Sequence, residues 1–404
     1  MKPKKPDSKS HKIELLAPAG DFECLTAAIN AGADAVYFGL QDFNMRARAK
    51  NFKISDLKKI SDICKQKRKK PIKIYLTLNT IIYDNETKKI ENIIKKVKPY
   101  VDAIICSDIS VIMLCKKYKI DFHISTQCSV SNSETAKFYK KLGATRIVLA
   151  RELNLKQIKK ISKIIPIEIF IHGAMCISIS GRCLTSQFLF NESANRGRCI
   201  HPCRRLYHVK DKEGNELRLE NNYVLSAKDL CTLPFIEKLK KAGISAFKIE
   251  GRNKEPEYVS SVVKVYRKAL DKKLTKKQIQ ESLDELNKVY NKGFSSGFYL
   301  KLPTSDDFSK SEDSSAMQSK QFIGKINHYY PKISVGLLKL NTGKLKINDE
   351  IMIIGKTTGV IKTKIQSMEI NHKPITKAEK GQDVGIKLPL CRKNDELYKI
   401  IKRR

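Results

Sequence analysis

Four cysteines lie close together in one segment of this 404-residue chain, and their type and spacing indicate a metal site. The segment reads IHGAMCISISGRCLTSQFLFNESANRGRCIHPCRR. Six residues separate Cys176 from Cys183, fifteen separate Cys183 from Cys199, and three separate Cys199 from Cys203. Four thiolates from one loop form a soft sulfur site suited to an iron–sulfur cluster or to zinc. Neither close pair has the CxxC spacing of a zinc ribbon, so zinc is the alternative.

The residues around the cysteines favour a negatively charged cluster. Five arginines flank the thiols: Arg182, Arg196, Arg198, Arg204 and Arg205. Positive charge nearby favours the thiolate form that binds metals. His201 could be a zinc ligand, although it is more simply an exposed histidine, and Cys231 could be a fifth ligand, although it is more simply a core cysteine. A metal site that only stabilises the fold is the structural alternative.

The elements that must position this segment follow a repeating strand–helix pattern. Eight short β-rich runs occur before residue 251: Ile13–Ala17, Ala35–Gly39, Lys73–Asn79, Ala103–Ser107, Phe122–Thr126, Arg146–Ala150, Glu168–His172 and Ala246–Glu250. Amphipathic helical segments separate them, and two more follow at Pro256–Lys272 and Lys276–Asn291. This pattern predicts a closed (β/α)8 TIM-like barrel of class α/β. An open doubly wound sheet is the alternative, but no GxGxxG follows the first strand.

The connection between the seventh and eighth strands is much longer than an ordinary βα loop. It spans roughly residues 173–244 and carries five of the eleven cysteines. It leaves the carboxyl end of the seventh strand, which is the end where βα barrels form their active sites. The pattern therefore predicts a Cys-rich insertion at the mouth of the barrel.

Polar residues at the carboxyl ends of the predicted strands complete the candidate site. The catalytic candidates, which offer acid–base groups and an anion clamp, are His172, Lys248, Glu250 and Arg252. The candidates for substrate contact are Asn79, Asp108, Gln127, Arg151 and Glu152. Any of them could instead belong to a buried ion pair, such as one of Glu250 with Arg252 or with Arg151. As a set they would suit an acidic small molecule, because guanidinium groups bind carboxylates.

Composition divides the chain into four parts. We expect a basic tail at 1–12, the barrel domain at 13–300, and a linker at 301–320 that lacks hydrophobic periodicity. From 321 to 404 the pattern changes to period two, which predicts a small antiparallel β-barrel. Such barrels commonly bind or position a partner, and a purely structural role is the alternative.

Charge and hydropathy restrict the class of protein. The chain has 79 Lys and Arg against 42 Asp and Glu, a formal net charge of +37. This charge suits a polyanionic partner such as RNA, although a lysine-biased genome would produce a similar surface. No run approaches eighteen apolar residues and no apolar segment follows the basic start, so we expect neither a membrane span nor a secretory signal. We therefore expect a cytoplasmic protein without structural disulfides.

The sequence closely resembles peptidase family U32 from about Glu14 to Lys301. The resemblance is carried by ELLAPAGDFECLTAAINAGADAVYFG, RARAKNF, STQCSVSN, the cysteine segment, LSAKDL and KIEGR. The residues from Gln321 onward are similar to that family's C-terminal domain, which resembles the second domain of translation factors.

The resemblance implies one of two activities. The family was named for collagenase-type proteases, whereas its better understood members are oxygen-independent hydroxylases. These act on a tRNA wobble uridine or a ribosomal RNA cytidine, with prephenate implicated as the oxygen source, or on a ubiquinone precursor. They depend on a 4Fe-4S cluster, and the positions here that match its ligands are Cys176, Cys183, Cys199 and Cys203. Some relatives use a different fourth ligand, and Cys231 could replace Cys203.

The residues favour the hydroxylase. A protease needs an activated nucleophile or a metal-bound water, and the chain contains no HExxH and no local cysteine-protease signature. Cys176 and His172 could form a Cys–His dyad, but four clustered cysteines fit a metal cluster better. We therefore predict an RNA hydroxylase, with a U32 peptidase as the alternative and a non-catalytic RNA-binding factor as a third class.

Overall fold

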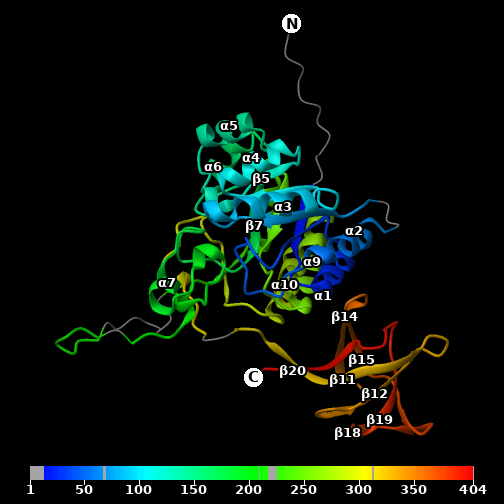
Figure 1. The fold of residues 1–404 in the computed structure, drawn as a ribbon. Helices are drawn as coiled ribbons and strands as arrows, with labels where there is room; N and C mark the ends of the chain where they lie inside the picture. The colour runs from blue at the N-terminus through cyan, green and yellow to red at the C-terminus, as the bar shows by residue number, and fades with distance from the viewer. Residues whose placement is uncertain (1–12, 67–69, 209, 217–224, 312–313, 404) are drawn as a thin grey trace.

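A computed structural model describes residues 13–66, 70–208, 210–216, 225–311 and 314–403. These residues form a (β/α)8 barrel followed by antiparallel β sheets (Figure 1). The basic tail predicted at 1–12 lies outside the described residues. Within the described ranges, no helix is long and apolar enough to cross a membrane.

Eight parallel strands close into a barrel, which confirms the predicted fold. Seven of them pair in chain order: β1 (Glu14–Pro18), β2 (Ala35–Gly39), β3 (Lys73–Leu78), β4 (Ala103–Cys106), β5 (Phe122–Ile124), β6 (Arg146–Val148) and β7 (Ile167–Gly173). The eighth, β9 (Ala246–Ile249), pairs in parallel with both β7 and β1 and so closes the barrel. Most strands are nearly continuous apolar runs, as expected of parallel strands buried on both faces.

Helices surround the barrel and follow its strands in sequence. They are α1 (Phe22–Asn30), α2 (Leu57–Lys65), α3 (Thr87–Val97), α4 (Ile109–Lys117), α5 (Ser133–Leu142), α6 (Leu155–Ile161), α8 (Ile236–Lys240), α9 (Pro256–Asp271) and α10 (Lys276–Asn287). Side-chain caps define several helix starts, because they accept hydrogen bonds from otherwise unpaired amides. Asp21 accepts from the backbone N of Cys24 at the start of α1, and Asn132 accepts from that of Thr135 at the start of α5.

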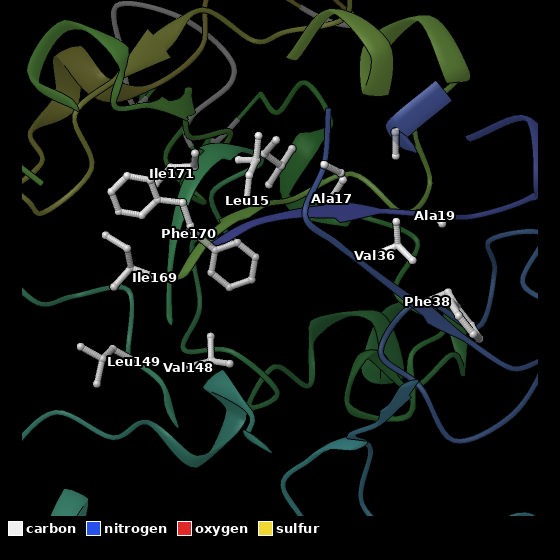
Figure 2. Close-up of a cluster of buried hydrophobic side chains, with 14 of the residues drawn as sticks. Leu15, Ala17, Ala19, Val36, Phe38, Val148, Leu149, Ile169, Phe170 and Ile171 are labelled. Carbon is white, nitrogen blue, oxygen red and sulfur yellow. The ribbon is translucent and has the colours of Figure 1, made fainter. Parts of the chain in front are cut away.

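The strands separate two apolar layers because their side chains alternate between faces. Leu15 and Ala17 of β1 belong to the large cluster between the strands and the helices, part of which Figure 2 shows. Leu16 lies on the opposite face, in a small cluster inside the barrel that includes Tyr37 and Tyr75. The alternation of side chains along each strand thus decides which residues point into the barrel and which face the helices.

The chain between β7 and β9 is the long insertion expected from the sequence. It contains α7 (Thr185–Phe190) and β8 (Asp229–Cys231), and β8 pairs antiparallel with the end of β7. After α10, the strand β10 (Phe294–Ser295) pairs in parallel with β8. The sequence did not predict β8 or β10, because elements of three and two residues are too short to show a period.

The C-terminal part consists of antiparallel strands around one apolar core, as the period-two pattern predicted. Its strands are β11 (Gln318–Tyr330), β12 (Val335–Lys339), β13 (Lys344–Lys346), β14 (Glu350–Gly355), β15 (Gly359–Lys364), β16 (Met368–Ile370), β17 (Lys373–Ile375), β18 (Lys377–Glu379), β19 (Asp383–Lys387) and β20 (Glu396–Lys402). They form an eight-stranded sheet, in the order β15-β14-β20-β11-β12-β19-β16-β17, and a pair of β13 with β18.

The turn between β14 and β15 docks this part onto the barrel. The Thr26 hydroxyl of α1 donates to the carbonyl of Lys356 at 2.6 Å, and the Asn30 amide donates to the carbonyl of Thr358 at 3.3 Å. Lys362 of β15 also pairs with Glu285 of α10 at 3.1 Å. Lys320 of β11 pairs with Glu257 of α9 at 2.9 Å, and none of the described C-terminal strands contributes a residue to the cavity at the mouth of the barrel.

Candidate functional site

A cavity of about 750 Å³ opens at the carboxyl ends of the barrel strands. Its lining comes from the strand ends and from the Cys-rich insertion. The predicted site residues that line it are Asn79, Gln127, Arg151, Cys176, Cys183, Cys199, Cys203, Lys248, Glu250 and Arg252. The structure therefore brings the four cysteines and the charged residues of KIEGR into one cavity, at the end of the barrel where such sites form. Three predicted residues, His172, Asp108 and Glu152, do not line it.

We call the charged residues Arg46, Arg151, Lys248, Glu250 and Arg252 the cavity floor. Glu250 is its acidic member. Its carboxylate accepts hydrogen bonds from Nε and Nη2 of Arg46 at 3.2 and 2.9 Å, and it lies 3.9 Å from Nη2 of Arg151. Burial alone would raise the pKa of Glu250, but the guanidinium groups of Arg46, Arg151 and Arg252 hold it at about 2. The carboxylate is therefore ionised at neutral pH, where it is a counter-charge to the arginines and a weak base with no proton to donate.

Arg252 also lies on the floor, and its guanidinium group occupies space that a glycine leaves free. Its Nη1 donates to the Thr77 hydroxyl at 2.9 Å, and the residue is 4% exposed. A Cβ at Gly39 would lie 2.5 Å from that Nη1, so only glycine leaves room for the guanidinium group. Burial lowers the pKa of Arg252 to about 10, which still leaves it charged at neutral pH.

A ladder of buried charges continues from the cavity toward the amino ends of the strands. Lys248 Nζ lies 2.8 Å from Glu168, Glu168 lies 3.2 Å from Arg146, and Arg146 lies 2.7 Å from Glu14. Burial lowers the pKa of Lys248, and the adjacent carboxylate of Glu168 opposes this shift. Because an unpaired buried charge costs about 3–5 kcal/mol, this ladder holds the Lys248 ammonium in position at the floor.

The wall opposite Glu250 carries neutral hydrogen-bonding groups. The Asn79 amide donates to Oε1 of Gln127 at 3.1 Å and to the Ser125 hydroxyl at 3.3 Å. Its carbonyl oxygen accepts from the backbone N of Met45 at 3.3 Å. These contacts fix the amide orientations beside the charged floor.

The four cysteines of the insertion form the rim of the cavity. Burial raises the pKa of Cys203 to about 11, with Arg204 lowering it and the other three thiols raising it further. Cys203 is therefore close enough to each of the other three thiols for their charge to affect its pKa. Cys199 Sγ also accepts from the backbone N of His201 at 3.4 Å and from the Ser186 hydroxyl at 3.8 Å.

The chemistry of this donor set fits a soft metal group. Thiolate ligands suit iron–sulfur clusters and zinc, and N–H···S contacts such as the one to Cys199 tune cluster potentials. Among the described residues, no three Cys, His, Asp or Glu side chains converge as ligands of one metal ion would. In a four-iron cluster each thiolate binds a different iron, so the four sulfur atoms need not share one centre.

His172 lies behind the cavity and not at its mouth. It is 2% exposed, packs against the rings of Tyr258, Tyr266 and Phe294, and burial lowers its pKa to about 3. The cause is a register shift between Phe170 and His172 where β7 pairs with β9. Without this β-bulge, His172 would face inward as Phe170 does, because the two residues are two apart.

The other predicted residues outside the cavity have local explanations. Asp108 caps α4, accepting from the backbone N of Ser110 at 2.9 Å, and also accepts from that of Ile82 at 3.1 Å. Glu152 is exposed to solvent. Cys231 is 3% exposed on β8, where its sulfur accepts from the Tyr266 hydroxyl at 3.7 Å, so it does not join the other four cysteines.

The structure adds residues that the sequence did not single out. Arg46 comes from the loop after β2, and its place in RARAKNF was the available signal. Asp229 and Lys254 line the side of the cavity nearest β8. Asp229 is buried with no hydrogen-bond partner for Oδ1, and burial raises its pKa, while burial lowers the pKa of Lys254 to about 8. With Arg46, Arg151, Lys248, Arg252 and Lys254, cationic side chains outnumber acidic ones in the cavity.

A family model for peptidase family U32 matches residues 20–308. The chain belongs to this family. A U32 relative, a collagenase of Porphyromonas gingivalis, is 41% identical over 97% of this chain and 98% of its own length. A 23S rRNA 5-hydroxycytidine synthase of Escherichia coli is 41% identical over 65% of this chain and 40% of its own length. The tRNA hydroxylation protein P of Escherichia coli is 32% identical over 78% of this chain and 80% of its own length.

Proposed function

We propose that this U32 protein is an oxygen-independent RNA hydroxylase that holds a 4Fe-4S cluster on Cys176, Cys183, Cys199 and Cys203. The observation that carries the proposal is that all four thiols line the same cavity as the cation-rich floor. Relatives named for rRNA and tRNA hydroxylation, together with the net charge of +37, support RNA as the substrate. A bound cluster would supply one-electron chemistry at the rim of this cavity.

The cation-rich floor would bind an acidic co-substrate of the prephenate type. Hydroxylation of a pyrimidine replaces a C–H bond with C–OH, a two-electron oxidation. When O2 takes no part, a co-substrate must accept the two electrons, and the oxygen atom comes either from that co-substrate or from water. Arg46, Arg151 and Arg252 offer guanidinium groups, which bind carboxylates at two points. Glu250 neutralises one of these charges, so the floor keeps a net positive charge.

The neutral wall would contact the base. A base within a helix cannot enter an enclosed site unless it leaves its stack, and an extruded base is commonly bound through its hydrogen-bonding edge. The amides of Asn79 and Gln127 carry both donors and acceptors in fixed orientations. They would orient a pyrimidine between the floor and the cysteine rim.

Peptide hydrolysis is the alternative, and the name of the nearly full-length Porphyromonas gingivalis relative favours it. A cysteine peptidase needs a base beside its thiol, but His172, the predicted partner of Cys176, lies outside the cavity. The GFSSG run at 293–297 has the GxSxG spacing of serine hydrolases, yet β10 leads into turns and not into the helix that this motif requires.

Loss of one hydroxylated nucleoside from a deletion strain is the expected result of the most direct test. Mass analysis of the nucleosides of total tRNA and rRNA would identify the modified base and RNA together. Restoration by the intact gene is the control. An unchanged set of RNA nucleosides in the deletion strain, with gelatin cleaved by the purified protein, would establish the peptidase alternative.

Protein purified without oxygen should be brown and contain about four irons per chain, as a filled four-thiolate cluster site requires. Iron and acid-labile sulfide analysis, with visible absorption spectra, would measure this. Zinc in equal amount to the protein, with no iron after anaerobic reconstitution, would contradict the proposed cluster.

A further inference from the structure

An exposed apolar face lies beside the cysteine rim. It consists of Leu184, Phe188 and Leu189 at helix α7, and we call these three residues the α7 face. Phe188 is 82% exposed, while Leu184 and Leu189 are 55% and 57% exposed. A phenylalanine so open to water does not stabilise the fold, and grouped exposed apolar side chains commonly mark a binding surface.

Exposed positive charges occur next to helix α7. Arg182 precedes the helix by three residues, Arg205 contacts its last residue, and Arg48 and Arg198 pair with Glu192, which follows the helix. Arg205 stacks over the ring of Phe190, the last residue of α7, at 4.5 Å. The nearby acid, Glu192, lies 3.8 Å from Arg48 and 3.6 Å from Arg198, so positive charge remains in excess. Aromatic rings among arginines suit single-stranded nucleic acid, whose bases stack and whose phosphates pair with cations.

The α7 face is connected to the cavity by buried contacts. Ser186 of α7 is fully buried, and its hydroxyl accepts from the backbone N of Ile200 at 3.1 Å and contacts Cys199 Sγ at 3.8 Å. Thr185, the first residue of α7, lines the cavity together with Cys183. The helix therefore presents its apolar side chains at a defined position relative to the cysteine rim.

We infer that the α7 face binds unpaired bases next to the target nucleotide, with Phe188 as the stacking ring and the surrounding arginines on the flanking phosphates. This inference rests on the proposed RNA hydroxylase function. A target base that enters the cavity leaves its stack, and its neighbours lose a stacking partner. An exposed ring beside the opening replaces that partner and lowers the cost of extrusion.

The test uses the full-length protein, purified without oxygen, and two RNA probes of equal length. One probe is a stem-loop with an unpaired loop, and the other is a fully paired duplex. Phe188→Ala should weaken stem-loop binding about ten-fold in fluorescence anisotropy, as expected for loss of one base–aromatic stack. Duplex binding should remain unchanged. Phe188→Trp should retain stem-loop affinity, and Phe138→Ala, which removes another exposed ring (58%) from α5, is the control.

Other occupants of the α7 face give different results. Wild-type affinity in Phe188→Ala, or in Phe188→Leu, would overturn the inference, because leucine keeps apolar contact but cannot stack. A wild-type dimer that Phe188→Ala converts to a monomer would assign the face to a second copy of the chain. The deletion strain can also be complemented with the gene for the Phe188→Ala variant. If the deletion strain lacks a hydroxylated nucleoside and this variant restores it in full, the inference fails while the proposed function stands. No RNA binding and no altered nucleoside would reject both.

Discussion

Cys176→Ser and Cys199→Ser should each remove the iron and abolish RNA hydroxylation in cells. Serine has almost the same size as cysteine but is a poor ligand for iron, so the cluster is lost with little change in packing. Both positions lie at the rim of the cavity and are at least partly exposed, so the exchange should not disturb the core. Iron content would be measured on the purified variants, and the hydroxylated nucleoside in the complemented deletion strain.

Cys231→Ala is the matched control, because Cys231 is buried on β8 and points away from the other four cysteines toward Tyr266. This variant should keep its iron and its activity. Iron retained in Cys176→Ser but lost in Cys231→Ala would show that the ligand set has been assigned wrongly. Full hydroxylation by an iron-free Cys199→Ser protein would remove the cluster from the mechanism.

Glu250→Gln should keep the cluster but lower hydroxylation by about 10²- to 10⁴-fold, because the buried arginines of the floor lose their counter-charge, a loss that costs about 3–5 kcal/mol. The carboxylate orients Arg46 through two hydrogen bonds and offsets the charges of Arg151 and Arg252. An amide of the same shape removes the negative charge, so the arginines repel one another and no longer hold their positions on the floor. Single-turnover hydroxylation of RNA, together with iron content, would separate this defect from loss of the cluster.

Glu152→Gln is the control for that substitution, because Glu152 also follows a barrel strand but is exposed and lies outside the cavity. It should have wild-type activity. Since the pKa of Glu250 is about 2, its carboxylate stays ionised above about pH 4.5, and its titration should not appear in the pH–activity profile near neutrality. Gelatin cleavage that Glu250→Gln abolishes, with RNA nucleosides unaltered, would contradict the hydroxylase assignment.

The two halves of the cavity arise from different parts of the fold. The floor comes from barrel strands and is held by the buried ladder from Lys248 through Glu168 to Arg146. The rim comes from the insertion, whose cysteines are brought to the mouth because the chain leaves β7 at its carboxyl end. In the proposed function, the charged floor of the barrel would bind the co-substrate. A cluster held by the cysteines of the insertion would transfer the electrons.

Local patterns in the sequence were sufficient to predict the barrel and most of the residues of its floor. Eight apolar runs alternating with amphipathic helices predicted the closed parallel barrel, since each pattern is a short-range property of the chain. Lys248, Glu250 and Arg252 lie at the carboxyl end of the eighth barrel strand, and this position was sufficient to predict that they line the mouth. The cysteine spacing likewise placed four thiols in one loop before any contact was known.

Only the tertiary structure decided where exceptions to these patterns fall. His172 was predicted at the mouth because it ends the predicted seventh strand, but the β-bulge in β7 places it in an aromatic cluster, and this bulge depends on the pairing with β9. Arg46 and Arg48 look alike in RARAKNF, yet Arg46 pairs with Glu250 on the floor while Arg48 pairs with Glu192 at the surface. These partners lie more than a hundred residues away in the chain, and a local pattern carries no information about contacts of that range.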